Sequence, residues 1–166
     1  MIRRAAVSGV VALSFLGLAA AASGLPPFST ARKTSPSSGG QAELFQAAAG
    51  CHSTYDRFVL RARSGGKPGY DVRYVSRIVA DGSGNPISVQ GNKFLLVVIH
   101  NARGHTNGGT NLLPSTLTPH CSNLRQLKKA GDFEGVVSYG LGLSRKTGFR
   151  VFRLTSPTRI VVDVAH

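Results

Sequence analysis

The sequence has no Trp, only two Cys and only seven acidic residues among 166. Two Cys without a Cys-x-x-Cys pair exclude an iron–sulfur or zinc-ribbon scaffold, because these need more closely spaced thiolates. The motifs of serine hydrolases, zinc proteases and phosphate-binding loops are missing too, since the Gly-Leu-Gly run at 140–142 has neither a third glycine nor a following helix. Charged residues make up 16% and hydrophobic residues 42%, which excludes a wholly disordered basic tail.

The first 22 residues have the layout of a secretory signal peptide. Arg3 and Arg4 precede an apolar run of 18 residues, in which Ala20 and Ala22 fit the small-residue positions of a signal-peptidase site. We expect a Sec-type signal peptide at 1–22 that directs the chain to the cell envelope or beyond, with no stable membrane insertion after cleavage. The alternative is an uncleaved anchor, because 18 apolar residues are near the lower limit for a membrane span.

Residues 23–50 are rich in Pro, Ser, Thr, Gly and Ala. Such a composition buries little apolar surface, so we predict a flexible linker at 23–50. A short helix at 42–49 is compatible with the sequence, but two turns alone are marginal in water.

From residue 51 onward, short runs alternate apolar and other residues with period two, and turns rich in Gly, Pro, Asn and Asp separate them. The uninterrupted apolar run at 95–99 predicts a central strand. About eight strands without a long helix predict an all-β domain at 51–166, a two-sheet antiparallel β-sandwich. In the last predicted strand, Ile160, Val162 and Val164 should face the core while Arg159 and Asp163 face outward.

Cys51 and Cys121 are expected to form a disulfide, because two thiols in an exported chain usually pair. The alternative is a zinc site, since His52 and His120 lie beside them and complete a Cys2His2 set. Neighbouring residues of an extended chain point in different directions, which makes tetrahedral coordination by both pairs awkward. We therefore expect no metal and no cofactor.

Histidines on a basic secreted protein also suggest acid–base catalysis of the ribonuclease kind. His100, His105 and His120 are the candidates, and a small secreted hydrolase would use His105 with Arg103. Nothing in the sequence fixes the distances between these side chains. We expect no catalytic residues and no enzymatic activity.

Arginine dominates the charge, which is formally +13. If the predicted strands at 57–63 and 70–79 pair as a hairpin, five arginines share its outer face: Arg57, Arg61, Arg63, Arg73 and Arg77. Guanidinium groups bind carboxylates and phosphates through two parallel hydrogen bonds, so this row is a candidate ligand-binding surface, together with Arg103 and His105 of the loop at 101–114. The alternative is a solvated face whose charges discourage edge pairing.

The hairpin at 149–164 resembles the closing strands of AMIN domains, in which a Ser-Pro-x-Arg turn leads into an aliphatic strand that ends in Asp. Residues 54–166 resemble the AMIN-like branch of secreted and lipoprotein-anchored bacterial envelope proteins, with matching runs at 55–59, 68–70, 79–84, 102–105 and 130–137. The resemblance implies a β-sandwich and a non-catalytic binding or targeting role in the periplasm or cell wall, with peptidoglycan as the implied target.

We therefore expect an exported envelope-binding module whose partner is a cell-wall glycan or an anionic wall polymer. The alternative is a protein-interaction module that recruits a wall enzyme, a secretion component or another envelope protein through the loop at 101–114. Nucleic acid is not expected as a partner, because no recognition motif or aromatic platform accompanies the charge.

Overall fold

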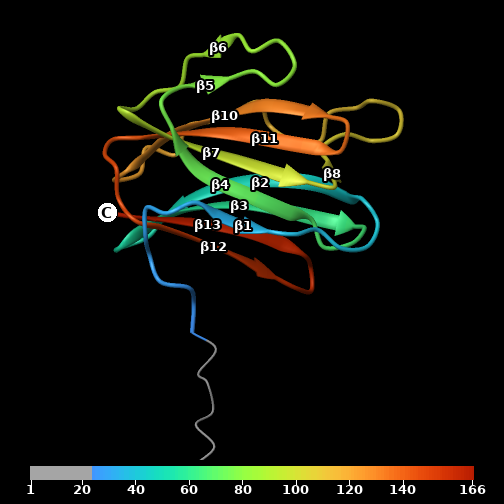
Figure 1. The fold of residues 1–166 in the computed structure, drawn as a ribbon, viewed down its shortest axis with the longest axis horizontal. Helices are drawn as coiled ribbons and strands as arrows, with labels where there is room; N and C mark the ends of the chain where they lie inside the picture. Colours follow the sequence, from blue (N-terminus) through green and yellow to red (C-terminus); the bar gives the residue numbers. More distant parts are fainter. Residues whose placement is uncertain (1–23) are drawn as a thin grey trace, which may run out of the picture.

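The computed structural model describes residues 24–166, and the expected signal peptide lies outside this range. The described residues form thirteen strands and no helix (Figure 1). Eight of these strands have six residues or more, and the other five have two or three, so the predicted number of about eight is too low. No helix in residues 24–166 is long and apolar enough to cross a membrane.

The first sheet has six antiparallel strands, with β7 and β11 at its centre. Its order is β1 (Lys33–Ser35), β4 (Gly69–Val75), β7 (Lys93–His100), β11 (Val136–Leu143), β10 (Leu124–Phe133) and β9 (Thr116–Leu117). The predicted central strand at 95–99 lies within β7, where Leu95, Val97 and Ile99 are fully buried.

The second sheet has five strands, with β3 at its centre. Its order is β12 (Phe149–Leu154), β13 (Arg159–Ala165), β3 (Tyr55–Ser64), β2 (Ala42–Cys51) and β8 (Ala102–Arg103). All its pairs are antiparallel except β2 with β8. The predicted all-β sandwich is confirmed.

The core lies between the two sheets and is made by alternate residues of each strand. Phe58 of the five-stranded sheet meets Tyr139 of the six-stranded sheet, with ring centroids 5.3 Å apart. The buried hydroxyl of Tyr139 donates a hydrogen bond to the carbonyl oxygen of Pro114 at 2.6 Å. Burial, assisted by the charge of Asp132, raises the pKa of Tyr139 far above its usual value, so this hydroxyl stays a donor.

The Gly-Leu-Gly run at 140–142 serves packing. A small hairpin of β5 (Ile78–Val79) and β6 (Pro86–Ile87) stands beyond the outer face of the six-stranded sheet (Figure 1). A Cβ atom at Gly140 would lie 2.5 Å from Cγ1 of Ile78, and one at Gly142 would lie 2.0 Å from the carbonyl oxygen of Gln90. The two glycines therefore let the chain around this hairpin lie directly on the β11 backbone.

The prediction of a flexible linker is wrong for the strands that fall within it. β1 pairs with β4, and β2 pairs with β3 from Glu43 to Cys51. The short helix considered at 42–49 is wrong as well, because Ala42 and Leu44 are fully buried on the inner face of a strand. Tertiary burial overrides the local composition here, so the folded domain begins before residue 51.

The segment that precedes β2 acts as a strap between the two sheets. Ser29 and Phe149 exchange two backbone hydrogen bonds of 3.1 and 2.9 Å, which attach the strap to β12. Arg32 holds Asp71 of β4 in an ion pair, with its Nε atom 2.9 Å from Oδ1. Arg73, two residues after Asp71 in β4, binds the same carboxylate.

Stability should depend on the ionisation of Asp71. Burial is the largest influence on this carboxyl and by itself raises its pKa, but Arg32 and Arg73 together bring the pKa below its usual value. A lowered pKa means that the stabilisation is complete above the unfolded-state pKa of about 3.9 and disappears as the pH falls through the folded-state pKa. We expect the Asp71→Asn variant to lose less stability than the wild type between pH 5 and pH 3, an interval of about one unit on either side of that value. Denaturant unfolding at each pH measures this, and parallel curves for the two proteins would contradict it.

Candidate functional site

The expected hairpin of the two arginine-bearing strands is wrong. β3 pairs with β2 and β13, whereas β4 pairs with β1 and β7 in the other sheet. Both sides of β3 are therefore occupied, one of them by the strand that the sequence composition assigned to a linker. Arg73 and Arg77 do not share a face with the arginines of β3, because Arg73 lies on the six-stranded sheet and Arg77 follows it in an exposed connection.

A different set of arginines gathers on the outer face of the five-stranded sheet, which we call the arginine face. The pairing register places Arg61 of β3 opposite Arg159 of β13, and Asp163 of β13 opposite both Arg57 and Arg150. The arginine face comprises Arg57, Arg61, Arg63, Arg103, Arg150 and Arg159. Arg159 was predicted to face outward, but neither it nor Arg150 was among the predicted ligand-binding residues, although both alternate with apolar residues in their strands.

Asp163 holds two of these arginines. Its carboxylate accepts two hydrogen bonds from Arg57, at 2.7 and 3.0 Å, and one from Nε of Arg150 at 2.8 Å. The hydrogen bond with Asp163 is the main cause that raises the pKa of Arg57. Asp163 does lie on the outer face, as expected, but its side chain is fully buried beneath the two guanidinium groups.

Glu43 holds two more arginines at the other edge of the face. Its carboxylate lies 3.1 Å from Nε of Arg63 and 3.0 Å from Nη2 of Arg103. The ring of Phe45 lies beneath Arg63, 5.1 Å from the guanidinium carbon. Glu43 and Phe45 belong to β2, so the predicted linker supplies part of this surface.

The Arg61–Arg159 pair has no carboxylate within 4.0 Å among residues 24–166. Nε of each arginine is shut off from solvent and has no hydrogen-bond acceptor in the described part of the chain. Arg61 makes one long hydrogen bond, 3.4 Å, to the side chain of Gln46, and its guanidinium lies 5.8 Å from the ring centre of Phe45. The positive charge of the arginine face is therefore least compensated at this pair.

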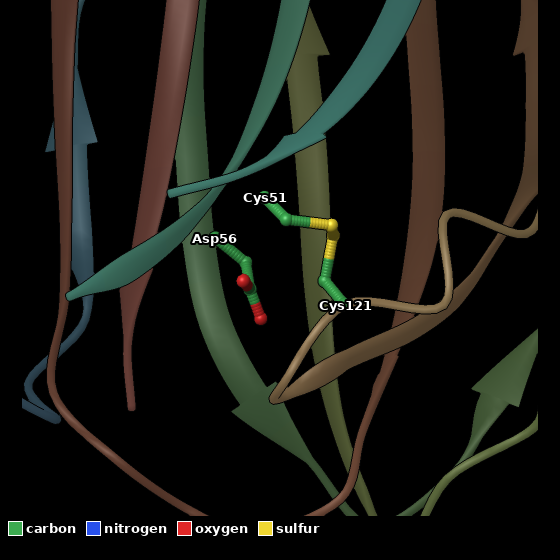
Figure 2. A group of neighbouring side chains, drawn as sticks. All are labelled: Cys51, Asp56 and Cys121. Atoms are coloured by element: carbon green, nitrogen blue, oxygen red, sulfur yellow. A yellow bond between two sulfur atoms is a disulfide. The ribbon is translucent and has the colours of Figure 1, made fainter. Parts of the chain in front are cut away.

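Cys51 and Cys121 form the expected disulfide, with their Cα atoms 5.2 Å apart. The bond joins the end of β2 to the segment before β10 (Figure 2). Asp56 lies beside the disulfide, and one ligand atom from each of these three residues falls within 4.8 Å of the others. Both sulfur atoms are bound to each other, so neither is a free thiolate for the zinc site considered above.

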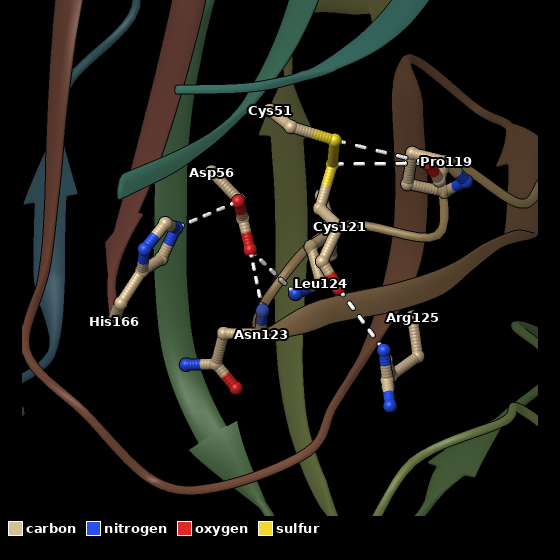
Figure 3. The surroundings of a disulfide bond; sticks show 8 residues. All are labelled: Cys51, Asp56, Pro119, Cys121, Asn123, Leu124, Arg125 and His166. Carbon is tan, nitrogen blue, oxygen red and sulfur yellow. Dashed lines mark hydrogen bonds and ion pairs between the residues drawn. A yellow bond between two sulfur atoms is a disulfide. The ribbon is translucent and has the colours of Figure 1, made fainter. Parts of the chain in front are cut away.

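The Asp56 carboxylate holds two segments of the fold together. It is fully buried and accepts hydrogen bonds from the backbone N–H groups of Asn123 and Leu124, at 2.7 and 2.8 Å (Figure 3). Its other oxygen lies 2.8 Å from Nε2 of His166. These contacts fix the start of β10 against β3, and the carboxylate has no exposed surface for a ligand.

The structure brings Arg103 and His105 together in one shallow depression of about 430 Å3 beside the β10–β11 turn. Nδ1 of His105 lies 3.1 Å from Asp132, while Arg103 is held by Glu43. His120 lines a separate depression with Arg125. The histidines considered for acid–base chemistry are therefore not gathered at one site. At the tip of the turn, Phe133 is 72% exposed.

The comparison with family models gives one result. The model of the AMIN-like domain matches residues 42–166, from the first residue of β2 to the end of the described chain. No curated protein and no solved structure matches the chain. The matched range contains every strand of the two sheets except β1, together with the disulfide and all six residues of the arginine face. The chain therefore belongs to the family of AMIN-like domain proteins.

Proposed function

We propose that this chain is an exported, non-catalytic module that binds peptidoglycan or an attached anionic polymer of the cell envelope through the arginine face. Membership of the AMIN-like family suggests a cell-envelope module, and the disulfide fits an oxidising compartment outside the cytoplasm. The observation that carries the proposal is that six arginines lie on one sheet face with two carboxylates, those of Glu43 and Asp163, which hold four of the six.

The remaining acidic residues do not neutralise this face. Asp71 is held by the strap, Asp132 by Lys129 and His105, and Asp56 by backbone N–H groups and His166. Asp81 accepts a hydrogen bond from Ser138, and Glu134, in the β10–β11 turn, has no ion-pair partner within 4.0 Å among residues 24–166. Salt screens charges over about 8 Å at physiological ionic strength, so a net charge spread over the molecule would not hold a polymer. A contiguous cluster of guanidinium groups does, because each can form two hydrogen bonds with one anion.

A sheet face suits an extended polymer with repeated anions. Neighbouring strands lie about 4.8 Å apart. The arginines of β12, β13, β3 and β8 therefore form an array across the sheet, which several repeats of one polymer chain can contact at the same time. Apolar groups between the arginines, such as Phe152 and Phe45, keep the guanidinium stems extended on the sheet.

The test compares two triple variants for retention on purified cell wall at about 0.15 M salt. We expect Arg61→Gln, Arg63→Gln and Arg159→Gln together to abolish retention. The control triple, Arg77→Gln, Lys93→Gln and Arg145→Gln, removes the same charge from exposed residues away from the arginine face and should retain binding. Thermal melting checks that both triples remain folded.

An equal loss in both triples would mean that the attraction is diffuse and that the arginine face is only a solvated surface. No loss in either triple would favour the alternative function, a protein-interaction module. The observation behind that alternative is Phe133, whose exposed ring lies between depressions of about 430 and 470 Å3 at the β10–β11 turn.

A further inference from the structure

We propose that the Arg61–Arg159 pair is a site for one phosphate group of a phosphodiester polymer. This inference rests on the proposed function and narrows it. It names phosphate as the anion, and it names the two side chains that select phosphate over carboxylate. The evidence lies in the strand register, in two unpartnered nitrogen atoms and in the surface next to the pair.

The register places two positive charges directly opposite each other. Arg61 and Arg159 are Cα partners in the antiparallel β3–β13 pair, and both project from the outer face. Directly opposed residues have Cβ atoms about 4.5–5.5 Å apart, and like charges in these positions destabilise a sheet. Four residues further along the same two strands, and on the same outer face, Arg57 lies opposite Asp163 instead. The fold therefore compensates one cross-strand arginine and leaves the other pair uncompensated.

Two nitrogen atoms of the pair without hydrogen-bond acceptors indicate that an anion binds between Arg61 and Arg159. Nε of Arg61 and Nε of Arg159 are both buried without an acceptor, and a buried donor that lacks a partner costs about 1–3 kcal/mol. Nε of Arg103 is unpartnered too, but Glu43 holds that guanidinium through Nη2, whereas no carboxylate lies within 4.0 Å of Arg61 or Arg159 among the described residues. Nε is also one of the two donors with which a guanidinium binds an anion side-on, as Arg57 does with Asp163, so each side chain has to turn its Nε toward solvent when the anion binds. An anion that settles between the two arginines would supply acceptors and remove the repulsion.

A small depression lies between the end of β3 and the β12–β13 turn, and it is lined by Ala62 and Thr158, the sequence neighbours of Arg61 and Arg159, but by neither arginine itself. Its volume is about 250 Å3, and Arg63 and the hydroxyl-bearing residues Ser64, Ser156 and Thr158 line it. None of the described residues that line it is acidic. It is smaller than the roughly 300–1,000 Å3 of small-molecule pockets, so it fits one repeat of a polymer rather than a whole ligand.

The donor set fits a phosphate better than a carboxylate. A carboxylate offers two oxygens that lie in one plane, and on this face Asp163 and Glu43 each hold two arginines with them. Arg61 and Arg159 project from two neighbouring strands and present two forks that need not lie in one plane. A tetrahedral phosphodiester offers two non-bridging oxygens that share one negative charge, and two ester oxygens, so it can engage both forks at once.

The test measures binding of two polymers of matched charge, poly(glycerol phosphate) and poly-L-glutamate, by titration calorimetry at about 0.15 M salt. We expect the wild type to bind the phosphodiester polymer about tenfold tighter than the carboxylate polymer, which corresponds to 1.4 kcal/mol. The double variant Arg61→Gln, Arg159→Gln should lose this preference. The control double Arg77→Gln, Arg145→Gln should keep it, because these exposed arginines lie elsewhere.

Two further variants separate charge from geometry. Arg61→Lys with Arg159→Lys keeps the charge but removes both forks, and it should lose the preference for phosphodiester while still binding both polymers. The glutamine double variant should also melt at a higher temperature than the wild type, because it removes the opposed charges. Inorganic phosphate should raise the melting temperature of the wild type and leave that of the double variant unchanged.

Equal affinity of the wild type for the two polymers would overturn the phosphate site, and so would an equal loss of preference in the two glutamine doubles. If the preference is absent while the wild type still adheres to cell wall, the phosphate site is wrong and the proposed function stands. If the wild type does not adhere to cell wall at all, the proposed function is wrong, whatever the polymer titrations give.

Discussion

Replacing Asp163 by Ala is expected to lower the free energy of unfolding by about 3–5 kcal/mol. The Asp163 side chain is fully buried and is the only carboxylate within 4.0 Å of Arg57 and Arg150 in the described part of the chain. The aromatic rings of Phe28, Tyr55 and Phe152 lie within 5.9 Å of these guanidinium groups and limit their access to water. Without Asp163, two positive charges remain close together in a poorly hydrated place. Urea unfolding monitored by circular dichroism measures the loss.

A matched control shows whether the loss comes from the unpaired charges. The triple variant Arg57→Met, Asp163→Leu, Arg150→Met removes all three charges and keeps similar side-chain volume. Replacing a whole buried ion cluster by apolar residues is often neutral or stabilising, so we expect this triple to be markedly more stable than the single Asp163→Ala variant. A single variant that unfolds at the wild-type urea concentration would refute the assignment of Asp163 as the anchor of this face.

Removing the disulfide by Cys51→Ala and Cys121→Ala is expected to cost about 4 kcal/mol. The two cysteines are 70 residues apart, and the bond limits the conformational freedom of that long loop in the unfolded chain. Urea unfolding with and without a reductant measures the effect. The reductant should destabilise the wild type by a similar amount and leave the double variant unchanged.

Mass spectrometry provides the independent check. The oxidised protein should be lighter than the reduced protein by two hydrogens, and it should carry no zinc. Free thiols with stoichiometric zinc would contradict the disulfide and restore the Cys2His2 alternative.

The local patterns predicted which residues form strands, because period-two burial is a property of neighbouring residues. In β13, the alternation of Ile160, Val162 and Val164 with other residues correctly placed these side chains in the core. The same alternation in β3 placed Phe58 and Leu60 inward and the arginines outward. The closing hairpin also carried the family resemblance, which the match over residues 42–166 confirms.

The pairing of the strands could not be predicted in the same way. The turn at 65–69 suggested a hairpin, yet the chain crosses there from one sheet to the other. The reason is that β2 already occupies the side of β3 where a hairpin partner would pair. β2 was hidden in a segment rich in alanine, whose small side chains give a weak strand pattern although Ala42 and Ala47 are buried.

The error in strand pairing also changed which residues form the candidate site. Arg57, Arg61 and Arg63 were correctly assigned to one outward face, because they share one strand. Which arginines join them depends on the neighbours of β3, and the pairing with β13 brings in Arg159 instead of the predicted Arg73 and Arg77.

The sequence by itself determined the all-β class, the positive charge and the strand that carries three arginines, since composition and period-two alternation are written in consecutive residues. Only the tertiary structure decided that Asp163 is buried between Arg57 and Arg150 while Arg61 faces Arg159 without a carboxylate. The physical reason is that a cross-strand neighbour is set by register between segments about 100 residues apart, and no local pattern specifies that register.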